Sequence, residues 1–375
     1  MARRANRQTQ HPRHNRPNFL LELMSSGASP ELLADNAGAP ESSSPILIIP
    51  YMWIGDFVRC HSVVKLLKAR WPRRPVDLLT TTLCAPLVDY MPGVRKGIVG
   101  DLPRGRLPLP QYRTLSARLR GENYGTALVM LRTWKSALAP FLAGIPQRVG
   151  FIGEARFFLL NDLRWGERKL ERMIDRMGAL AFPKGAALPQ DWPLPELVVP
   201  AVQLTAFRAR FGLPQDERRV VALAPGAVGP GKAWPLSHYV ALTRMLAAQD
   251  VTIWVLGGPN ETPLAAEIIK TGGAAARDLT GHDLRNAILA LKAADAAVTN
   301  DSGLMHIAAA LGTPTIAIFG PTHPRLWGPL NPLAAALEPD RAAGAHDVRR
   351  RNTADVSPER VIAAVGKALA ADGSS

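Results

Sequence analysis

Short apolar runs alternate with longer mixed stretches from Pro45 onward, and this alternation indicates the fold class. Runs such as Ile46–Ile49 and Val251–Leu256 have the length and composition of buried strands. Segments between the runs, such as Leu236–Ala248, have the length and residue types of helices. Strands that alternate with helices favour βαβ units and a mostly parallel sheet. We therefore predict an α/β protein.

The same pattern gives a full set of elements. The predicted strands are Ile46–Ile49, Val76–Thr80, Gly97–Val99, Thr126–Leu131, Val220–Ala224, Val251–Leu256, Ala296–Thr299 and Thr315–Phe319. The predicted helices are Phe57–Arg70, Ala85–Tyr90, Gln111–Arg120, Trp134–Ala143, Leu236–Ala248, Glu261–Thr271, Asp283–Ala293, Gly303–Leu311 and a last helix from Pro358 to about Ala370.

A proline-rich stretch between Phe182 and Pro200 separates the two series of strands and has the composition of a linker. Five segments follow from this division: an arm at 1–43, a first Rossmann-like domain at 44–182, a linker at 183–200, a second Rossmann-like domain at 201–356 and a C-terminal helix at 357–370. Ligands of open α/β sheets bind at the carboxyl ends of the strands. The functional site is therefore expected in a central cleft that the two domains face.

The overall composition, 47% hydrophobic and 20% charged residues, is that of a soluble globular chain. No apolar run approaches the ~20 residues that a membrane-spanning helix needs. The two cysteines, Cys60 and Cys84, are too few for a disulfide framework. The basic start of the chain lacks the apolar segment of a signal peptide, so we expect a cytoplasmic enzyme.

The charge balance is strongly positive, with 45 Lys and Arg against 31 Asp and Glu, a net charge of +14. Such a field favours anionic partners, namely nucleic acid, an acidic membrane surface or a phosphorylated substrate. Part of the excess lies near the start of the chain, in Arg3, Arg4, Arg7, Arg13 and Arg16. We interpret residues 1–43 as a disordered tail, and an arm that contacts anionic lipid is the alternative.

Three common nucleotide-site motifs are missing from the sequence. It contains no Gly-x-Gly-x-x-Gly fingerprint and no Gly-Lys-Ser/Thr phosphate loop, which disfavours nicotinamide enzymes and P-loop ATPases. It also contains no Asp-x-Asp pair of the kind that holds a divalent metal in many sugar-nucleotide enzymes. Other groups must therefore neutralise any bound diphosphate, and we expect neither a metal nor a cofactor.

The strongest candidate for such a phosphate site is the turn Asp301-Ser302-Gly303, where a predicted strand ends and a helix begins. Asp301 or Ser302 can cap the helix, and Gly303 lets a ligand approach the backbone. Free N–H groups and the positive end of the helix then bind phosphate without a metal. Leu304 and His306, in the first helical turns, complete the candidate contacts. An ordinary capped turn, with His306 as a packing residue, remains the alternative.

Further candidates follow other strand ends. The loop from Gly226 to Lys232 is rich in glycine and ends on an ammonium group that can contact phosphate. Glu261 offers a carboxylate for ribose hydroxyls. In the first domain, Asp56 occupies the corresponding place after the first strand, where a carboxylate can accept a proton from an attacking hydroxyl. Asp56 as a simple helix cap is the alternative.

These motifs resemble those of glycosyltransferase family 9, the bacterial heptosyltransferases, which have the GT-B fold. The resemblance extends from about Ile46 to the final helix. The stretches that carry it are Trp53–Asp56, Lys135–Leu138, Gly144–Gly150, Leu159–Asp162, Lys232–Pro235, Thr299–Leu311 and Phe319–Thr322.

The resemblance implies a metal-independent, inverting transfer of L-glycero-D-manno-heptose from ADP-heptose to the first heptose of the lipopolysaccharide inner core. By analogy, Asp56 is the general base and Lys232 stabilises the departing ADP. The Asp301–Gly303 turn and His306 assist Lys232, and Glu261 lies near the ribose. A GT-B enzyme that uses a different nucleotide sugar or a surface-glycan acceptor is the alternative within this class.

The acceptor implied by the resemblance carries carboxylates and phosphates at the cytoplasmic face of the inner membrane, so a peripheral enzyme with exposed cations is expected. The candidate acceptor contacts are Arg132, Lys135, Arg148 and Arg156, and solvated surface cations are the alternative for each. A nucleic-acid or membrane-binding module is the competing class for the net charge. No RNA-binding aromatic motif, zinc finger or basic helix supports it, and no specific nucleic-acid partner is expected.

Overall fold

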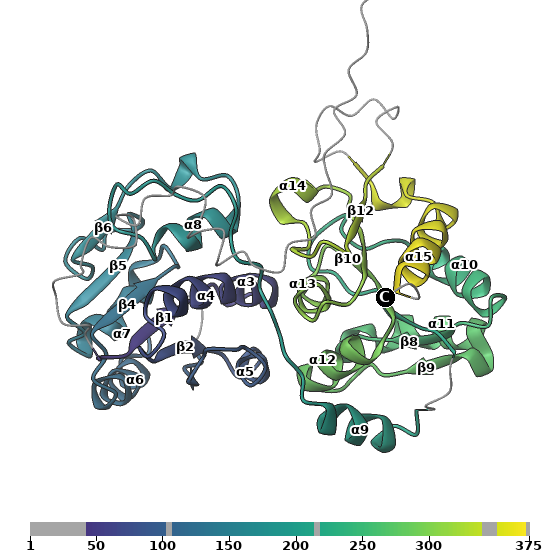
Figure 1. Cartoon of the computed structure of the whole chain (residues 1–375), viewed down its shortest axis with the longest axis horizontal. Coiled ribbons are helices and arrows are strands. Elements are labelled where there is room, and N and C mark those ends of the chain that lie inside the picture. The colour runs from purple at the N-terminus through teal and green to yellow at the C-terminus, as the bar shows by residue number, and fades with distance from the viewer. Residues whose placement is uncertain (1–42, 103–106, 214–217, 340–350, 373–375) are drawn as a thin grey trace, which may run out of the picture. The chain divides into compact units, whose positions relative to one another are not determined.

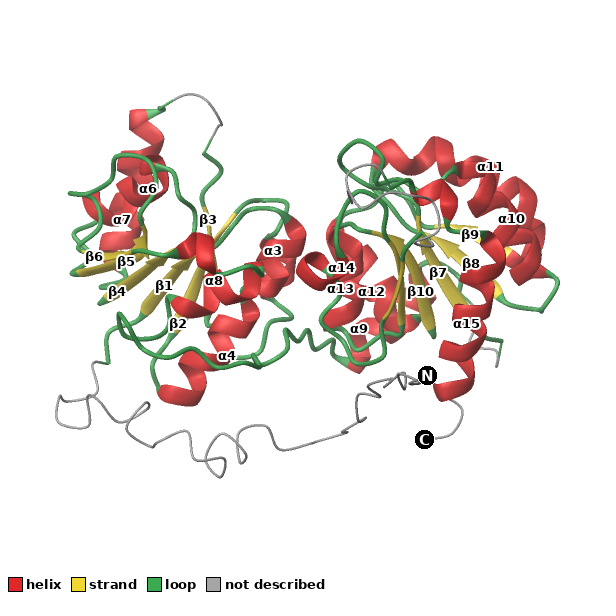
Figure 2. Cartoon of the chain, turned by 90° about the horizontal axis from the view of Figure 1, so that it is seen from above, coloured by secondary structure: helices red, strands yellow, loops and turns green. Residues whose placement is uncertain are grey.

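A computed structural model describes residues 43–102, 107–213, 218–339 and 351–372 of the chain. These residues form two six-stranded parallel sheets with helices on their faces (Figures 1 and 2). The α/β architecture predicted from the sequence is therefore confirmed. The arm predicted at 1–43 lies outside the described residues apart from its last position.

The first sheet has the strand order β3-β2-β1-β4-β5-β6, in which the first strand of the chain is central. Every pairing in this sheet is parallel, so all six carboxyl ends lie at one edge. The strands are β1 (Ile46–Ile49), β2 (Val76–Thr80), β3 (Lys96–Val99), β4 (Thr126–Val129), β5 (Gln147–Phe151) and β6 (Asp162–Arg164). The associated helices are α3 (Ile54–Arg59), α4 (His61–Arg70), α5 (Ala85–Val88), α6 (Leu109–Gly121), α7 (Trp134–Leu142) and α8 (Met173–Ala179).

The second sheet repeats this plan with the order β12-β11-β10-β7-β8-β9, again parallel throughout. Its strands are β7 (Val220–Ala224), β8 (Thr252–Val255), β9 (Ala276–Asp278), β10 (Ala296–Asn300), β11 (Thr315–Ile318) and β12 (Ala335–Leu337). The helices are α9 (Ala201–Arg210), α10 (Leu236–Ala247), α11 (Thr262–Gly272), α12 (Leu284–Ala293), α13 (Gly303–Ala310), α14 (Pro324–Trp327) and α15 (Pro358–Asp372).

The predicted strands and most predicted helices are present to within a few residues, and the main error concerns the first helix. The stretch predicted as one helix from Phe57 is two, α3 and α4, which meet at Cys60. Helix α3 begins at Ile54, so Asp56 lies in its first turn rather than in a preceding loop. A carboxylate in a first turn is stabilised by the positive end of the helix.

The elements that the apolar pattern missed are mostly short or lie at sheet edges. Strands β9 and β12 are the edge strands of the second sheet, and each has three residues, of which only Ala276 in β9 is buried. A strand with one covered side needs no continuous apolar run, so its sequence carries little signal. Strands β5 and β6 and helices α8, α9 and α14 were also missed.

Residues 180–200, between α8 and α9, form neither helix nor strand. Their backbone is nevertheless tied to both halves of the chain. Leu197 N donates to Ala310 O at the end of α13 (2.8 Å), and Val198 N donates to Tyr90 O after α5 (2.8 Å). The predicted domain limits at 182 and 200 stay predictions, but this segment clearly contacts elements of both sheets.

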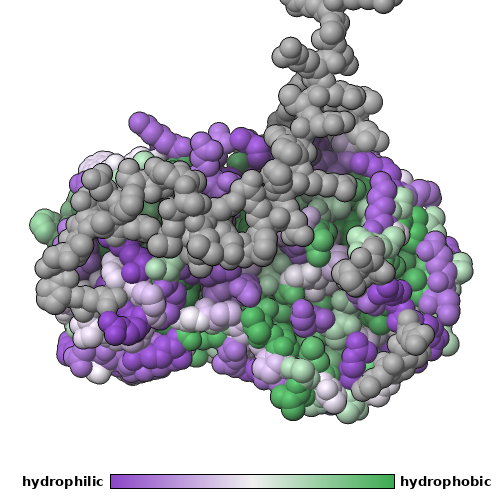
Figure 3. Space-filling view, viewed as in Figure 1, coloured by the Kyte–Doolittle hydropathy of each residue, from purple (hydrophilic) through white to green (hydrophobic). Residues whose placement is uncertain are grey.

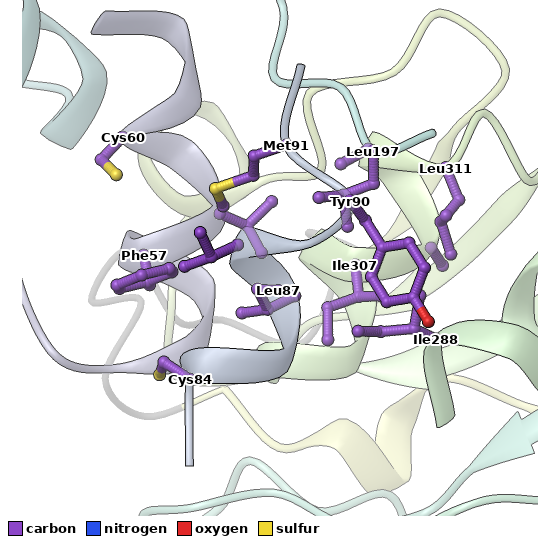
Figure 4. Close-up of a cluster of buried hydrophobic side chains, with 14 of the residues drawn as sticks. Phe57, Cys60, Cys84, Leu87, Tyr90, Met91, Leu197, Ile288, Ile307 and Leu311 are labelled. Carbon is purple, nitrogen blue, oxygen red and sulfur yellow. The ribbon is translucent and has the colours of Figure 1, made fainter. Parts of the chain in front are cut away.

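One hydrophobic cluster joins the two halves, which lie within one compact unit of the chain. Helix α3 packs against α13, and α5 packs against α12. Figure 4 shows Phe57 and Leu87 from the first half in this cluster with Ile288 and Ile307 from the second. Burial of these side chains favours the assembled arrangement by roughly 1.5–3 kcal/mol for each fully covered side chain.

Two glycines allow α3 and α13 to approach closely. A Cβ atom added at Gly303 would lie 2.7 Å from Ile54 Cβ, and one added at Gly55 would lie 2.4 Å from His306 Cδ2. Both distances are shorter than real Cβ contacts, and Ile54 Cβ cannot move away without its helix. The helices are therefore in contact because neither glycine carries a side chain.

We expect Gly303→Ala to lower the free energy of unfolding by about 1–3 kcal/mol, the usual cost of overpacking. Gly366→Ala is the matched control, because Gly366 lies in helix α15 and an added Cβ would meet nothing within 4 Å. That control should be neutral or stabilising by up to about 1 kcal/mol, from helix propensity. Urea unfolding of both variants measures the difference. Equal stabilities would show that α3 and α13 can move apart to accommodate a methyl group at little cost in free energy.

Candidate functional site

The Asp301 turn joins the end of β10 to the start of α13, as predicted, and it holds a partly buried ion pair. The Asp301 carboxylate accepts hydrogen bonds at Oδ2 from Lys232 Nζ (2.7 Å) and from Thr322 Oγ1 (2.7 Å). Asp301 is buried, and Lys232 is partly accessible. Two loops that are 69 residues apart in sequence therefore place a cation beside the start of a helix.

Ser302 lies at the N-cap position of α13, but its side chain makes no capping hydrogen bond. This corrects the expectation that Asp301 or Ser302 caps the helix, since the Asp301 carboxylate is bound to Lys232 and Thr322 instead. Within the described part of the chain, Ser302 Oγ is buried and has no hydrogen-bond partner. The first turn of α13, from Gly303, thus offers its positive end and an unused hydroxyl to an anion.

Asn300 fixes the loop that carries Lys232. Its side chain is fully buried, with Oδ1 accepting from Trp234 N (3.0 Å) and Nδ2 donating to Pro225 O (2.7 Å). Both ends of the Gly226–Lys232 loop are therefore attached to the residue that precedes Asp301. Asn300 was not among the residues predicted for the site, although an amide side chain at the end of a buried strand needs buried hydrogen-bond partners.

Glu261 and Gly226 lie together, as expected for two loops at neighbouring strand ends. Glu261 Oε2 accepts a hydrogen bond from Gly258 N (2.8 Å). A Cβ added at Gly226 would lie 2.9 Å from the Glu261 carboxyl group, so a larger residue at this position would displace the Glu261 side chain. The carboxylate is only partly buried, which leaves it accessible to hydroxyl groups of a ligand.

Asp56 approaches this cluster from the first half of the chain. Asp56 Oδ1 accepts a hydrogen bond from Arg59 Nη1 (3.0 Å) within α3. Burial raises the pKa of the Asp56 carboxyl above its ordinary value, and Arg59 acts against this increase. The charges of Asp301 and Lys232 also act on this pKa, which places Asp56 in the electrostatic field of the ion pair.

His306 lies on α13 against Gly55 and is buried. Burial holds its pKa well below the ordinary value, and the nearby positive charges of Arg59 and Lys232 lower it further. The imidazole is therefore neutral, with one N–H available as a donor. Among the described residues, no three His, Cys, Asp or Glu side chains form a group that could hold a metal ion.

The four candidate acceptor contacts fall into two pairs. Arg132 has an accessible side chain paired with Glu167 (3.0 Å), and Lys135 is partly exposed beside the Trp134 ring. Arg156 is only 1% exposed and donates to the carbonyls of Leu131 and Phe151. This burial corrects the expectation for Arg156, whose guanidinium holds strand ends together instead.

Arg148, like Arg156, donates hydrogen bonds to backbone carbonyls. Its Nε donates to Leu159 O (2.7 Å), its Nη1 donates to Ile145 O, and its guanidinium lies 5.5 Å from the centre of the Phe141 ring. These contacts join β5 to the chain before and after it. The geometry supports acceptor contact by Arg132 and Lys135 more than by Arg148.

Comparison with known proteins places the chain among enzymes. The family model for glycosyltransferase family 9 (heptosyltransferase) matches residues 112–355. Lipopolysaccharide heptosyltransferase 2 of Salmonella typhimurium is 35% identical over 348 residues, which cover 88% of this chain and 99% of that protein. Lipopolysaccharide heptosyltransferase 1 of Pseudomonas aeruginosa is 27% identical over 306 residues, 76% of this chain and 80% of that protein.

Solved structures with a similar fold include members of the same family. The structure of Escherichia coli ADP-heptose lipopolysaccharide heptosyltransferase II matches with a TM-score of 0.79 and 32% identity, covering 88% of this chain and 100% of that one. A family 9 glycosyltransferase from Veillonella parvula has the same fold, with a TM-score of 0.77 at 17% identity. The GT-B-type fold implied by the sequence motifs is confirmed. The chain belongs to glycosyltransferase family 9, the heptosyltransferases, and is a glycosyltransferase.

Proposed function

We propose that the chain transfers L-glycero-D-manno-heptose from ADP-heptose to the first heptose of the lipopolysaccharide inner core. The observation that carries this proposal is the partly buried Lys232–Asp301 pair at the N-terminus of α13, which has no side-chain cap, with the Asp56 carboxylate in the field of that pair. The relatives named heptosyltransferase 2 are more similar to the chain than the heptosyltransferase 1 of Pseudomonas aeruginosa, which favours the second heptose as the one added.

On the donor side, the diphosphate binds between Lys232 and the first turn of α13. The ammonium group, the free N–H groups and the neutral His306 supply positive charge and hydrogen bonds as the sugar–phosphate bond breaks. Gly226 and Ser302 line this phosphate site, Leu304 lies in the same turn, and Glu261 contacts the ribose. These groups neutralise the leaving ADP without a metal ion.

On the acceptor side, Asp56 removes the proton from the attacking hydroxyl of the acceptor heptose. The new bond forms at the anomeric carbon of the donor as the bond to ADP breaks, so one direct displacement inverts that centre. A carboxylate whose pKa is raised by burial is a stronger base than one in water. Such general-base assistance is typically worth about 10²–10⁴-fold in rate.

We further propose that the enzyme is peripheral at the cytoplasmic face of the inner membrane. No helix among the described residues is long and apolar enough to cross a bilayer. The chain after the carboxyl ends of the first sheet, including the first residue of α6, and the connection between β5 and β6 present exposed apolar side chains, namely Trp53, Leu83, Leu107, Leu109, Phe157, Phe158 and Trp165. We call these seven residues the apolar rim.

Two exposed cations, Arg168 and Lys169, lie close in sequence to Trp165 of the apolar rim. They directly follow the loop of Trp165 and form no ion pair among the described residues. Aromatic side chains next to cations suit the headgroup region of an anionic bilayer. In the second half, the apolar side chains visible in Figure 3 gather instead near α9 and α12, where Val202 is 75% exposed.

Product analysis by mass spectrometry tests the proposed reaction. Purified protein, ADP-heptose and a core acceptor with one heptose should give an acceptor that is heavier by one heptose, and added EDTA should not change the yield. Transfer of a different sugar from a panel of nucleotide donors would retain the site but favour the alternative GT-B activity. A loss of product with EDTA would contradict the metal-independent step.

The two proposed catalytic residues should differ in what they affect. Asp56→Asn should lower kcat by at least about 10²-fold and leave ADP affinity within about twofold, because Asp56 acts on the acceptor. Lys232→Met should weaken ADP binding and lower kcat together, since its ammonium contacts the leaving group. Calorimetric ADP titration and initial rates measure both effects, and loss of ADP binding in the Asp56 variant would exclude its role as a base.

Vesicle sedimentation tests the membrane proposal. The double variant Phe158→Ser/Trp165→Ser removes two side chains that are 89% and 65% exposed, and it should bind anionic vesicles at least tenfold more weakly than the native chain. Turnover on a soluble, delipidated acceptor should be unchanged. Val202→Ser is the matched control and should bind like the native chain. Equal vesicle binding by all three proteins would exclude the apolar rim as the contact.

A further inference from the structure

Arg59, the last residue of α3, is a buried cation for which the reaction described above has no use. Its residue is only 3% exposed. Burial lowers the pKa of its guanidinium, and the nearby Asp56 carboxylate opposes that change. A buried charge persists only with a partner and filled hydrogen bonds, so its contacts indicate what it is for.

The guanidinium of Arg59 divides its donors between two elements. Nη1 donates to Asp56 Oδ1 (3.0 Å), and Nη2 donates to Trp327 O (2.7 Å) at the end of α14. Its central carbon also lies 5.4 Å from the centre of the Trp327 ring. One planar group thus fixes one oxygen of the Asp56 carboxylate and, at the same time, the segment that ends at Trp327.

The segment from Thr322 to Trp327 connects this contact to the nucleotide loops. Thr322 Oγ1 donates to the Asp301 carboxylate, which also binds Lys232. Five residues later, Trp327 O accepts from Arg59. A continuous set of contacts therefore joins the cation for the leaving group to the carboxylate of the base.

We propose that Arg59 is a positioning residue for the general base: it holds Asp56 through Oδ1 and thereby turns Oδ2 toward the acceptor hydroxyl. It does so only while the 322–327 segment is in place, with Trp327 O accepting the second hydrogen bond of the guanidinium. The proposal rests on the proposed function of Asp56 as the base. It assigns the link between the Asp56 carboxylate and the 322–327 segment to a single side chain. Arginine suits this task because its rigid fork supplies two donors in fixed directions, whereas lysine supplies a point charge.

The charges around Asp56 set the sign of the expected pH effect. Besides Arg59, they are Lys232, which lowers the Asp56 pKa, and Asp301, which raises it. Burial, with smaller contributions from Glu167 and Asp56, raises the pKa of the half-buried Tyr51, and burial holds the pKa of His306 on α13 well below its ordinary value. Loss of Arg59 removes the strongest influence that lowers the Asp56 pKa, so the base then loses its proton only at higher pH.

The pH profile of kcat/KM tests the proposal, measured with whichever nucleotide sugar and acceptor prove active. Arg59→Met should move the acid limb to higher pH by at least one unit and lower kcat at least tenfold, with ADP affinity within about threefold of native. Arg59→Lys should keep the limb within half a unit of native but still lower kcat, because one ammonium cannot hold both partners. Arg285→Met is the matched control, because its ion pair with Asp89 also joins the two halves but involves neither Asp56 nor the 322–327 segment, and it should leave the profile unchanged.

Two outcomes would overturn the proposal. An unshifted acid limb in Arg59→Met, or native kcat in Arg59→Lys, would show that Arg59 only stabilises the fold. If Arg59→Met does not fold, as judged by thermal unfolding, the kcat of Arg59→Lys decides. Asp56→Asn separates this result from failure of the proposed function: if that variant retains the acid limb, Asp56 is not the base, whereas if it loses the limb, only the role of Arg59 is in question.

Discussion

The contact between α3 and α13 is the constraint on which the site depends. Each helix follows a central strand of its own sheet, so the contact brings together the carboxyl ends of two parallel sheets. Two glycines, Gly55 and Gly303, make the approach possible. Through this contact the Asp56 carboxylate of the first half lies in the electrostatic field of Lys232 and Asp301 of the second. In the proposed reaction, the base and the cation for the leaving group therefore come from different halves of the chain.

Four charged groups of alternating sign lie near this contact, and three of them, Asp56, Arg59 and Asp301, are buried. Arg59 pairs with Asp56, and Lys232 pairs with Asp301. Taking such charges out of water costs several kcal/mol each unless partners replace the lost hydration. The two salt bridges, the Thr322 hydroxyl and the Trp327 carbonyl supply those partners. The site is thus organised before any substrate arrives, which reduces the reorganisation that the reaction must drive.

Much of this arrangement follows from the sequence by simple rules. Apolar runs at β1 and β10 located the central strands, and the polar residues after them located Asp56 and the Asp301 turn. The rules failed where tertiary contacts decide the outcome. Arg156 has the charge of a surface cation but lies buried among backbone carbonyls, and Ser302 occupies a cap position without capping. The buried position of Arg59 could not be predicted, because one more arginine in a chain with a net charge of +14 is expected to be a solvated surface residue.

In the proposed reaction, the Lys232–Asp301 ion pair also accounts for how the site binds a diphosphate and then releases it. Lys232 is held in place by Asp301, so its ammonium needs no ordering when phosphate oxygens approach. The Asp301 carboxylate simultaneously weakens the attraction between Lys232 and the ligand. Binding is therefore moderated in the ground state, whereas the charge that develops on the departing phosphate strengthens the interaction during transfer. An enzyme gains rate from contacts that are stronger in the transition state than before it, and this pair provides one.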